Sequence, residues 1–464
     1  MDLSSSFKAY DVRGLVGVSL TDEVAEAIGA AFVDVLGLAG KTVFCGGDMR
    51  PSSKGFVSAF SQGAATRGAD VYDLGLIATD ELYFACGAMN AAGAIFTASH
   101  NPAQYNGIKM AKAGAVPISS DSGLFDIRDL AQRYLDHGFP KAESAGTVAP
   151  LDVLGDYALK LRSLVDLTDV RPLEVVVDAG NGMAGLTVPA VLGSEILEAL
   201  PLTIVPLYFE LDGTFPNHPA NPLEPENLRD LQAAVLAHGA DLGLAFDGDA
   251  DRCFVVDETG QPVTPSAITS MIAVREIARV QATGQSNPVV IHNLITSRSV
   301  PEFVQAAGGR PVRTRVGHSF IKARMAEEDA VFGGEHSAHY YFRDFYNADT
   351  GMLAAMHVLA ALGGQSAPLS TLARQYEPYS ASGEINSTVP DVSQAIADVC
   401  QTYDQSQGIR IDDLDGLSVI DESGEWWFNL RASNTEELLR LNVEARNAQL
   451  MERMRDAVLD MIRN

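Results

Sequence analysis

Three segments of the sequence share one pattern, and this repetition constrains the fold more than any other feature. They are "KTVFCGGDMRPSSKGFVSAF" from Lys41, "LEVVVDAGNGMAGLTVPAVL" from Leu173 and "PVVIHNLITSRSVPEFVQAA" from Pro288. Each starts with an apolar run typical of a strand, passes through a polar loop into residues with helical periodicity, and is followed by a second apolar run. This order is typical of a parallel βαβ unit, so we expect three similar α/β domains.

The last part of the chain has a different pattern. The apolar runs "GLSVI" and "WWFNL" flank a turn at residues 422–424, and "QLMERMRDAVLDMI" has helical periodicity, so we expect a smaller α+β domain. With 464 residues the chain is too long for one hydrophobic core. We expect domains at residues 1–150, 151–257, 258–375 and 376–464.

The charge of the chain argues against two classes of partner. Its 33 basic and 60 acidic side chains give a net charge of −27, which repels nucleic acid and anionic membranes. No apolar segment is long enough to cross a bilayer, the N-terminal residues lack a signal-peptide pattern, and four cysteines are scattered. We therefore expect a cytoplasmic protein that binds neither nucleic acid nor membrane.

The segment "AGAIFTASHNPAQYNGIKM" places three reactive side chains after an apolar strand. Ser99 and His100 follow the strand directly, and Lys109 lies ten residues beyond the serine. A segment that only turns the chain seldom carries a hydroxyl, an imidazole and an ammonium group together. We interpret Ser99 as a candidate nucleophile or phosphoryl carrier.

The segment "LGLAFDGDADRCFVV" places three carboxylates in a tight turn between two apolar strands. Asp247, Asp249 and Asp251 alternate along it, and carboxylates so close repel one another unless a cation binds them. An EF-hand is the alternative, but its sixth position needs glycine and holds Arg252 here, and the flanks are typical of strands. Arg252 indicates that an anion such as phosphate also binds nearby.

Two further loops carry candidate recognition residues. "FGGEHSAH" offers Glu335, His336, Ser337 and His339, which could read sugar hydroxyls. A zinc site and an ordinary polar loop are the alternatives, and His-x-x-His alone is a weak zinc pattern.

"LRASNTEE" lies between an apolar strand and an expected helix, where free N–H groups could bind phosphate. Its candidate residues are Arg431, Ser433, Asn434 and Thr435. A plain helix cap is the alternative, and it is compatible with phosphate binding.

Other basic and polar residues stand alone in the sequence. Tyr10 and Arg13 lie near the start in "FKAYDVRG", and His318 lies in an expected strand-to-helix turn in "TRVGHSFIK". An isolated histidine is more often structural than catalytic.

Together these motifs indicate phosphoryl transfer on a phosphorylated ligand. A cation and Arg252 could neutralise a phosphoryl group carried by Ser99, and Lys109 or His318 could move the proton. The loop at Arg431 could hold a second phosphate on the same ligand.

The sequence resembles the α-D-phosphohexomutase superfamily, most closely its bacterial phosphomannomutase/phosphoglucomutase group. The resemblance spans nearly the whole chain and includes, in the family's order, "YDVRG", "GGDMRPSS", "TASHNP", "NGIK", "AGNGMAG", "FPNHPANPLEPENL", "DGDADR", "GHSFIK", "GGEHSAH" and "RASNT". It implies four domains around a central cleft, three similar α/β domains with mixed sheets and a C-terminal α+β domain.

The resemblance also implies a role for each motif. Ser99 would be carried as phosphoserine, and Asp247, Asp249 and Asp251 would hold one Mg²⁺ together with an oxygen of that phosphoserine. Lys109 would be the general acid/base, with His100 and His318 near the reacting hydroxyls. The substrate would be bound by Tyr10, Arg13, Arg252, His318, Glu335, His336, Ser337, His339, Arg431, Ser433, Asn434 and Thr435.

The implied reaction interconverts hexose 1-phosphate and hexose 6-phosphate of mannose or glucose through a hexose 1,6-bisphosphate, which also serves as activator. A mutase for glucosamine phosphate, a sugar phosphatase that works through phosphoserine and a non-catalytic metal-binding module are the alternatives. We expect a monomer or a weak homodimer.

Overall fold

The structure is a computed structural model that describes residues 2–404, 406–432 and 438–463. The chain divides into two compact units. The first comprises residues 1–263 and 337–370, and the second comprises residues 264–336 and 371–464. Among the described residues, no helix has both the length and the apolar character needed to span a membrane.

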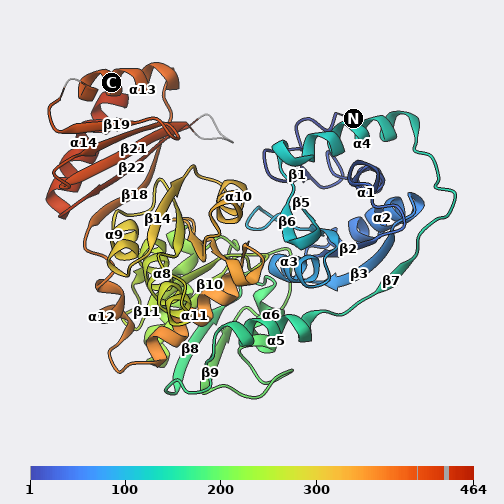
Figure 1. Ribbon diagram of the computed structural model, residues 1–464, viewed down its shortest axis with the longest axis horizontal. Coiled ribbons are helices and arrows are strands. Elements are labelled where there is room, and N and C mark those ends of the chain that lie inside the picture. The colour runs from blue at the N-terminus through green and yellow to red at the C-terminus, as the bar shows by residue number, and fades with distance from the viewer. Residues whose placement is uncertain (1, 405, 433–437, 464) are drawn as a thin grey trace. The chain divides into compact units, whose positions relative to one another are not determined.

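The first unit begins with a mixed sheet in the order β1-β5-β4-β2-β3-β7, with β6 paired to β5. Strands β2, β3, β4 and β7 run parallel, whereas β1 and β5 are antiparallel to their neighbours. Helices α1, α2 and α4 cover one face and α3 lies on the other (Figure 1). The strands are β1 (Val12–Leu15), β2 (Thr42–Gly47), β3 (Asp70–Leu76), β4 (Ala92–Phe96), β5 (Tyr105–Lys112), β6 (Val116–Pro117) and β7 (Val148–Pro150). The helices are α1 (Asp22–Leu36), α2 (Ser53–Thr66), α3 (Thr79–Ala88) and α4 (Leu124–His137), with 3₁₀ helices η1 (Ala113–Ala115) and η2 (Ser120–Ser122).

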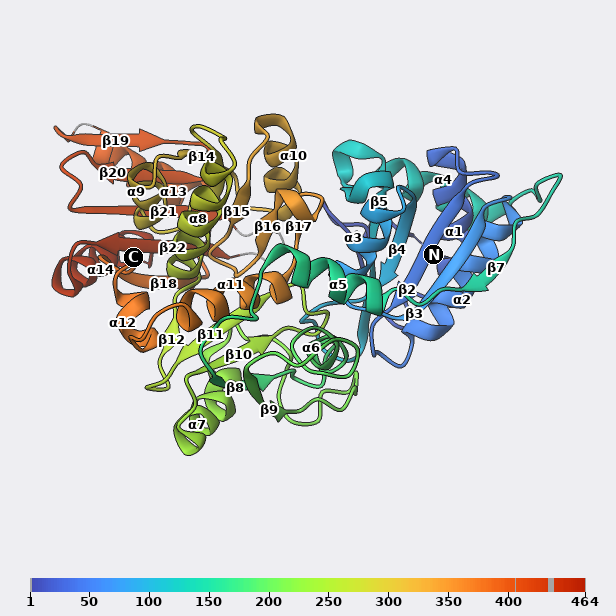
Figure 2. The same cartoon turned by 60° about the horizontal axis from the view of Figure 1, so that its bottom comes forward.

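A second mixed sheet of this unit has the order β12-β11-β10-β8-β9. Strands β8, β9 and β10 are parallel, and β11 returns antiparallel to β10. Helices α5 and α6 pack against each other (Figure 2). The strands of this sheet are β8 (Leu173–Asp178), β9 (Leu202–Leu207), β10 (Leu242–Phe246), β11 (Cys253–Asp257) and β12 (Pro262–Val263). The unit also contains β16 (Tyr340–Phe342) and β17 (Ala348–Asp349), which form an antiparallel pair outside this sheet. The helices are α5 (Leu154–Leu164), α6 (Ala184–Val191), η3 (Pro225–Leu228), α7 (Arg229–His238), η4 (Arg343–Phe345) and α11 (Gly351–Gly363).

The second unit contains a parallel group of strands and a C-terminal antiparallel sheet. In the first group β13 pairs with both β14 and β15. The C-terminal sheet has the order β18-β22-β21-β20-β19, and α13 and α14 pack on it around Phe428 and Leu441. The strands are β13 (Val289–Asn293), β14 (Arg310–Thr314), β15 (Phe332–Gly334), β18 (Ser380–Ser387), β19 (Ile409–Asp412), β20 (Leu417–Asp421), β21 (Trp426–Ala432) and β22 (Leu439–Ala445). The helices are α8 (Pro265–Ala282), α9 (Ser299–Ala306), α10 (His318–Glu328), α12 (Leu369–Arg374, which straddles the two units), α13 (Val392–Asp404) and α14 (Ala448–Arg463).

The structure confirms the three predicted βαβ units. They are β2-α2-β3, β8-α6-β9 and β13-α9-β14, and the two strands of each unit pair in parallel. The predicted hairpin at residues 422–424 joins β20 to β21, and the C-terminal periodic segment forms α14.

One predicted element is wrong. A helix was expected after the loop that follows Arg431, but residues 439–445 form β22, antiparallel to β21. The physical reason is a period of two: Leu439, Leu441 and Val443 are buried on one face of the sheet against α13 and α14.

Candidate functional site

Ser99 lies in the buried loop that follows β4. It is 4% exposed and adopts a left-handed backbone conformation with φ of 49°. A non-glycine residue there is uncommon and needs support from its surroundings. The Oγ1 of Thr97 accepts a hydrogen bond from the Ser99 N–H at 2.9 Å. The loop conformation directs the Ser99 hydroxyl to Asp247, whose Oδ2 it reaches at 2.7 Å.

Arg50 supports this loop through hydrogen bonds to its main chain. This residue was not predicted from the sequence. Its guanidinium donates to the carbonyl oxygens of Ser99 at 2.9 Å and Asn101 at 2.6 Å, and to those of Pro102 and Tyr105 at 2.9 Å. Its Nε donates to Asp48 at 3.2 Å. All five N–H groups of the planar guanidinium are therefore used. Arg50 lies in the motif "GGDMRPSS". Its place in this motif is the feature of the sequence that could have marked it as a functional residue.

The three aspartates follow β10, and the structure brings their loop against the serine loop. Asp247, Asp249 and Asp251 are all at most 1% exposed. A Cβ placed on Gly248 would lie 2.4 Å from the carbonyl oxygen of Ser99, so only glycine permits this approach. The predicted convergence of the serine and the aspartates is thus present within one compact unit.

The aspartates form a set of oxygen ligands suited to a divalent cation. One carboxylate oxygen from each lies within 4.8 Å of the others. Among residues 2–404, 406–432 and 438–463, no donor hydrogen-bonds to Oδ1 of Asp249 or to Oδ1 of Asp251, although both atoms are buried. Buried carboxylate oxygens without hydrogen bonds fit a hard cation such as Mg²⁺ or Ca²⁺.

The pKa values of Asp247 and Asp251 are shifted in opposite directions by their surroundings. Burial, reinforced by Asp251 and Asp249, raises the pKa of Asp247 to about 8. Burial also acts on Asp251, but the neighbouring Lys109 and His339 outweigh it and lower its pKa to about 2. A cation in this set would favour the ionised form of every member.

Lys109 extends from β5 to two of the aspartates. Its Nζ donates to Oδ2 of Asp249 at 2.7 Å and to Oδ2 of Asp251 at 2.5 Å. Burial opposes the charge of the ammonium group, but the two carboxylates raise the pKa of Lys109 well above its usual value. In this arrangement the side chain is a proton donor rather than an acceptor.

His100 and Arg252 complete the surroundings of the serine hydroxyl. The Nδ1 of His100 lies 3.2 Å from Ser99 Oγ and 2.7 Å from Nη2 of Arg252. Because arginine only donates, Nδ1 accepts this bond. Burial, and then the charge of Arg252, lower the pKa of His100 well below its usual value, so the imidazole is neutral. The guanidinium of Arg252 also pairs with Asp247 at 2.8 Å.

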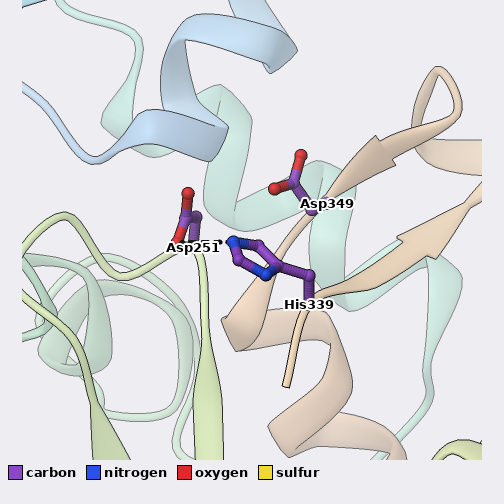
Figure 3. Close-up of side chains that lie close together, drawn as sticks. All are labelled: Asp251, His339 and Asp349. Atoms are coloured by element: carbon purple, nitrogen blue, oxygen red, sulfur yellow. Dashed lines mark ion pairs between the residues drawn. The ribbon is translucent and has the colours of Figure 1, made fainter. Parts of the chain in front are cut away.

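A second group of possible ligands adjoins Asp251. Asp251, His339 and Asp349 offer atoms within 4.8 Å of one another, and Figure 3 shows the imidazole between the two carboxylates. The Nε2 of His339 lies 3.6 Å from Oδ1 of Asp251, and Ser337 Oγ lies 3.2 Å from His339 Nδ1. The predicted residues Ser337 and His339 thus belong to the unit that holds Ser99. Asp349, on β17, was not predicted.

The side chain of Arg13, which lies on β1, contacts the serine loop. Its Nη1 donates to Oδ1 of Asn101 at 2.8 Å, and its Nε donates to Asp11 at 2.9 Å. Tyr10 is half-buried in the segment before β1.

The remaining predicted recognition residues lie in the second unit. Glu335 is 2% exposed, and Nδ2 of Asn293 donates to its Oε2 at 3.1 Å. The same amide lies 3.3 Å from Nδ1 of His336. Asn293, at the end of β13, was not predicted.

Arg431 ends a run of buried residues on β21. Its Nη2 donates to Oε2 of Glu384 on β18 at 2.9 Å, and burial lowers its pKa. Ser433, Asn434 and Thr435, predicted to form the phosphate cradle with Arg431, lie outside the described residues. His318 begins α10, as the expected strand-to-helix turn requires, but its side chain is likewise outside what the structure describes.

Comparison with known families accounts for nearly the whole chain. Residues 4–135, 156–260 and 265–379 match the alpha/beta/alpha domains I, II and III of phosphoglucomutase/phosphomannomutase, and residues 384–461 match the C-terminal domain. The chain belongs to the phosphoglucomutase/phosphomannomutase family.

Individual members of the family are similar over their full length. A phosphomannomutase of Escherichia coli is 40% identical over 463 residues, 98% of this chain and 99% of the relative. Proteins named phosphohexose mutases from Xanthomonas campestris pv. campestris are 40% identical over 99% of both chains. A crystal structure of a phosphoglucomutase/phosphomannomutase family protein from Burkholderia thailandensis superposes with a TM-score of 0.87 at 31% identity, covering 100% of this chain and 98% of that one.

Proposed function

We propose that this protein interconverts hexose 1-phosphate and hexose 6-phosphate, with Ser99 carrying the phosphoryl group. The observation that carries the proposal is the hydrogen bond from Ser99 Oγ to Asp247 Oδ2 at 2.7 Å, which joins the candidate carrier to the candidate metal ligands. The mutase names of the full-length relatives supply the reaction class.

The proposed reaction has two phosphoryl transfers. In the first, a sugar hydroxyl attacks the phosphorus of phospho-Ser99; the phosphorus–Oγ bond breaks, a bond to the sugar oxygen forms, and one proton passes from the sugar hydroxyl to Oγ. The resulting hexose 1,6-bisphosphate turns over and returns its other phosphoryl group to Ser99. The same bisphosphate is the proposed activator, because it would phosphorylate an unmodified serine.

Two side chains are suited to move the protons. The raised pKa of Lys109 keeps it protonated, so it can donate a proton to a leaving oxygen, and the lowered pKa of His100, beside Ser99 Oγ, keeps it neutral, so it can accept one. His318 is proposed to act near the same hydroxyls. Arg252 would offset negative charge on the transferred group.

We propose Asp247, Asp249 and Asp251 as the ligands of one Mg²⁺, together with an oxygen of phospho-Ser99. When bound, the cation would neutralise charge on the phosphoryl oxygens. The buried Oδ1 atoms of Asp249 and Asp251 support this assignment.

The substrate is proposed to be a phosphate of mannose or glucose. Glu335, His336, Ser337 and His339 would read its hydroxyls, Tyr10 and Arg13 would line the site, and Arg431, Ser433, Asn434 and Thr435 would hold the phosphate that does not react. A glucosamine phosphate substrate is the alternative. We further propose a cytoplasmic monomer or weak homodimer.

The test of this function is a coupled assay with a hexose 1,6-bisphosphate present. It compares kcat/KM for mannose 1-phosphate, glucose 1-phosphate and glucosamine 1-phosphate, and measures released inorganic phosphate in parallel. The proposal predicts isomerisation of the first two with little free phosphate. Free phosphate as the main product would instead identify a phosphatase, and preference for the amino sugar would overturn the substrate assignment.

A further inference from the structure

The first turn of α3 contacts the aspartate loop, although sequence reasoning gave the segment "IATDELYFA" no role. Thr79, Asp80 and Glu81 are each at most 1% exposed. The N–H of Thr79 donates to the carbonyl oxygen of Asp249 at 3.0 Å, and its Oγ1 donates to Oδ2 of Asp249 at 2.6 Å. Thr79 therefore holds Asp249 by both its main chain and its side chain.

These hydrogen bonds determine which carboxylate oxygen of Asp249 is available to bind a cation. Oδ2 receives hydrogen bonds from both Thr79 Oγ1 and Lys109 Nζ, whereas Oδ1 is buried and, among the described residues, accepts none. The terminal torsion of aspartate is soft, so without a partner the two oxygens exchange easily. Two donors on Oδ2 fix this torsion and leave Oδ1 for a cation.

Asp80 anchors the same helix turn to two other elements. Its Oδ2 accepts hydrogen bonds from the hydroxyl of Tyr157 on α5 at 2.7 Å and from Oγ1 of Thr350 at 2.6 Å. Thr350 caps α11 and directly follows Asp349 of the second ligand group. The start of α3 is thus fixed from two sides, so Thr79 presents its hydroxyl to Asp249 from a rigid base.

We propose that Thr79 is a positioning residue that orients the Asp249 carboxylate and thereby sets the affinity of the site for its divalent cation. The inference rests on the metal site proposed above. Hydrogen-bond partners of metal ligands typically contribute about 10–100-fold to metal affinity.

The test compares variants that differ by one hydroxyl. Thr79→Ser keeps the donor and Thr79→Ala removes it, while both lose the same methyl group. Thr187→Ser and Thr187→Ala are the matched control, because Thr187 is also buried and its Oγ1 donates to the carbonyl oxygen of Met183, the residue that precedes α6, at 3.4 Å. The dissociation constant of Mn²⁺, an oxygen-preferring probe for this site, is measured from the electron paramagnetic resonance of the free ion.

We expect Thr79→Ala to bind Mn²⁺ about 10–100-fold more weakly than Thr79→Ser, and the Thr187 pair to differ by less than about 3-fold. We also expect kcat of Thr79→Ala to recover at saturating Mg²⁺, which a general structural defect would not allow. Equal affinities of the two Thr79 variants would overturn the inference.

Asp249→Asn separates this outcome from failure of the metal site itself. If Asp249→Asn loses Mn²⁺ binding while the two Thr79 variants bind equally, only the positioning role fails. If Asp249→Asn binds like the unmodified protein, the proposed metal site fails as well.

Discussion

The two compact units hold their candidate functional groups in different ways. In the first unit, Ser99 contacts Asp247 across 148 positions of the sequence, and Lys109 contacts Asp249 across 140. In the second unit, Glu335, which directly follows β15, accepts a hydrogen bond from Asn293 on β13, and Arg431 on β21 donates one to Glu384 on β18. Ser99, Lys109 and the aspartates are therefore assembled with one another, whereas Glu335 and Arg431 each have a partner on a strand of their own unit. Changes to Ser99, Lys109 or the aspartates should act mainly on kcat, and changes to Glu335 or Arg431 mainly on KM.

The largest effect is expected for Ser99→Ala. Without the hydroxyl that carries the phosphoryl group, turnover of mannose 1-phosphate should fall by at least about 10³-fold, to the background of the coupled assay. An unchanged circular dichroism spectrum is the control for folding. Activity near that of the unmodified protein would contradict the role of Ser99 as the phosphoryl carrier, and with it the comparison between the two sets of residues.

Asp249→Asn should have the next largest effect. The carboxylate is proposed to bind the cation directly, so the Mg²⁺ concentration for half-maximal activity should rise by more than the about 10–100-fold expected for Thr79→Ala. Titration of activity with Mg²⁺ measures it. An unaltered Mg²⁺ requirement would remove Asp249 from the ligand set.

Arg431→Ala tests the proposed recognition role of a residue in the second unit. Loss of a charge-assisted hydrogen bond to phosphate should raise KM by about 10–100-fold with a smaller change in kcat. Arg446→Ala is the control, because Arg446 forms an exposed pair with Glu425 at 3.0 Å on the same domain. A fall in kcat at constant KM would contradict a role in recognition.

The smallest effect concerns stability and involves Glu81. Burial, and then repulsion from Asp80, raise the pKa of Glu81 to about 8, above the unfolded value near 4.5. Between these values the folded state binds the extra proton, so this group's contribution to stability is present at low pH and is lost as the pH rises to about 8.

Glu81→Gln keeps an acceptor for the N–H of Ala78, which now bonds Oε2 at 2.8 Å, and removes the titration. Between pH 5.5 and 7.5, the unfolding free energy of the unmodified protein should therefore fall by about 2–3 kcal/mol more than that of the variant. Thermal midpoints at the two pH values measure the difference. Parallel pH profiles would show that Glu81 titrates normally in the folded protein.

Local patterns in the sequence predicted most of the elements that carry the site. The strand "AGAIF" and the strands around "DGDADR" form β4, β10 and β11 because an unbroken apolar run suits a strand buried on both faces. Residues 439–445 form β22 rather than the helix expected after Arg431, because the alternation of Leu439, Leu441 and Val443 is a strand pattern.

Other features could not be read from the sequence because they depend on contacts between distant segments. Arg50 binds the loop around Ser99 from 49 positions away, and Thr79 binds Asp249 from 170 positions away. The motif "GGDMRPSS" contains Arg50 but does not show what this side chain binds, and no motif marks Thr79. Only the packing of α3 and the serine loop against the aspartate loop gives these side chains their partners.

The central claim is that Ser99 carries the phosphoryl group, and its modification state tests this most directly. The protein is incubated with Mg²⁺ and glucose 1,6-bisphosphate, and the peptide containing Ser99 is examined by mass spectrometry before and after addition of excess mannose 6-phosphate. The account predicts one phosphate on Ser99 that is lost when the sugar phosphate is added, with bisphosphate appearing in equal amount. A Ser99 that remains unmodified while the enzyme turns over would contradict it.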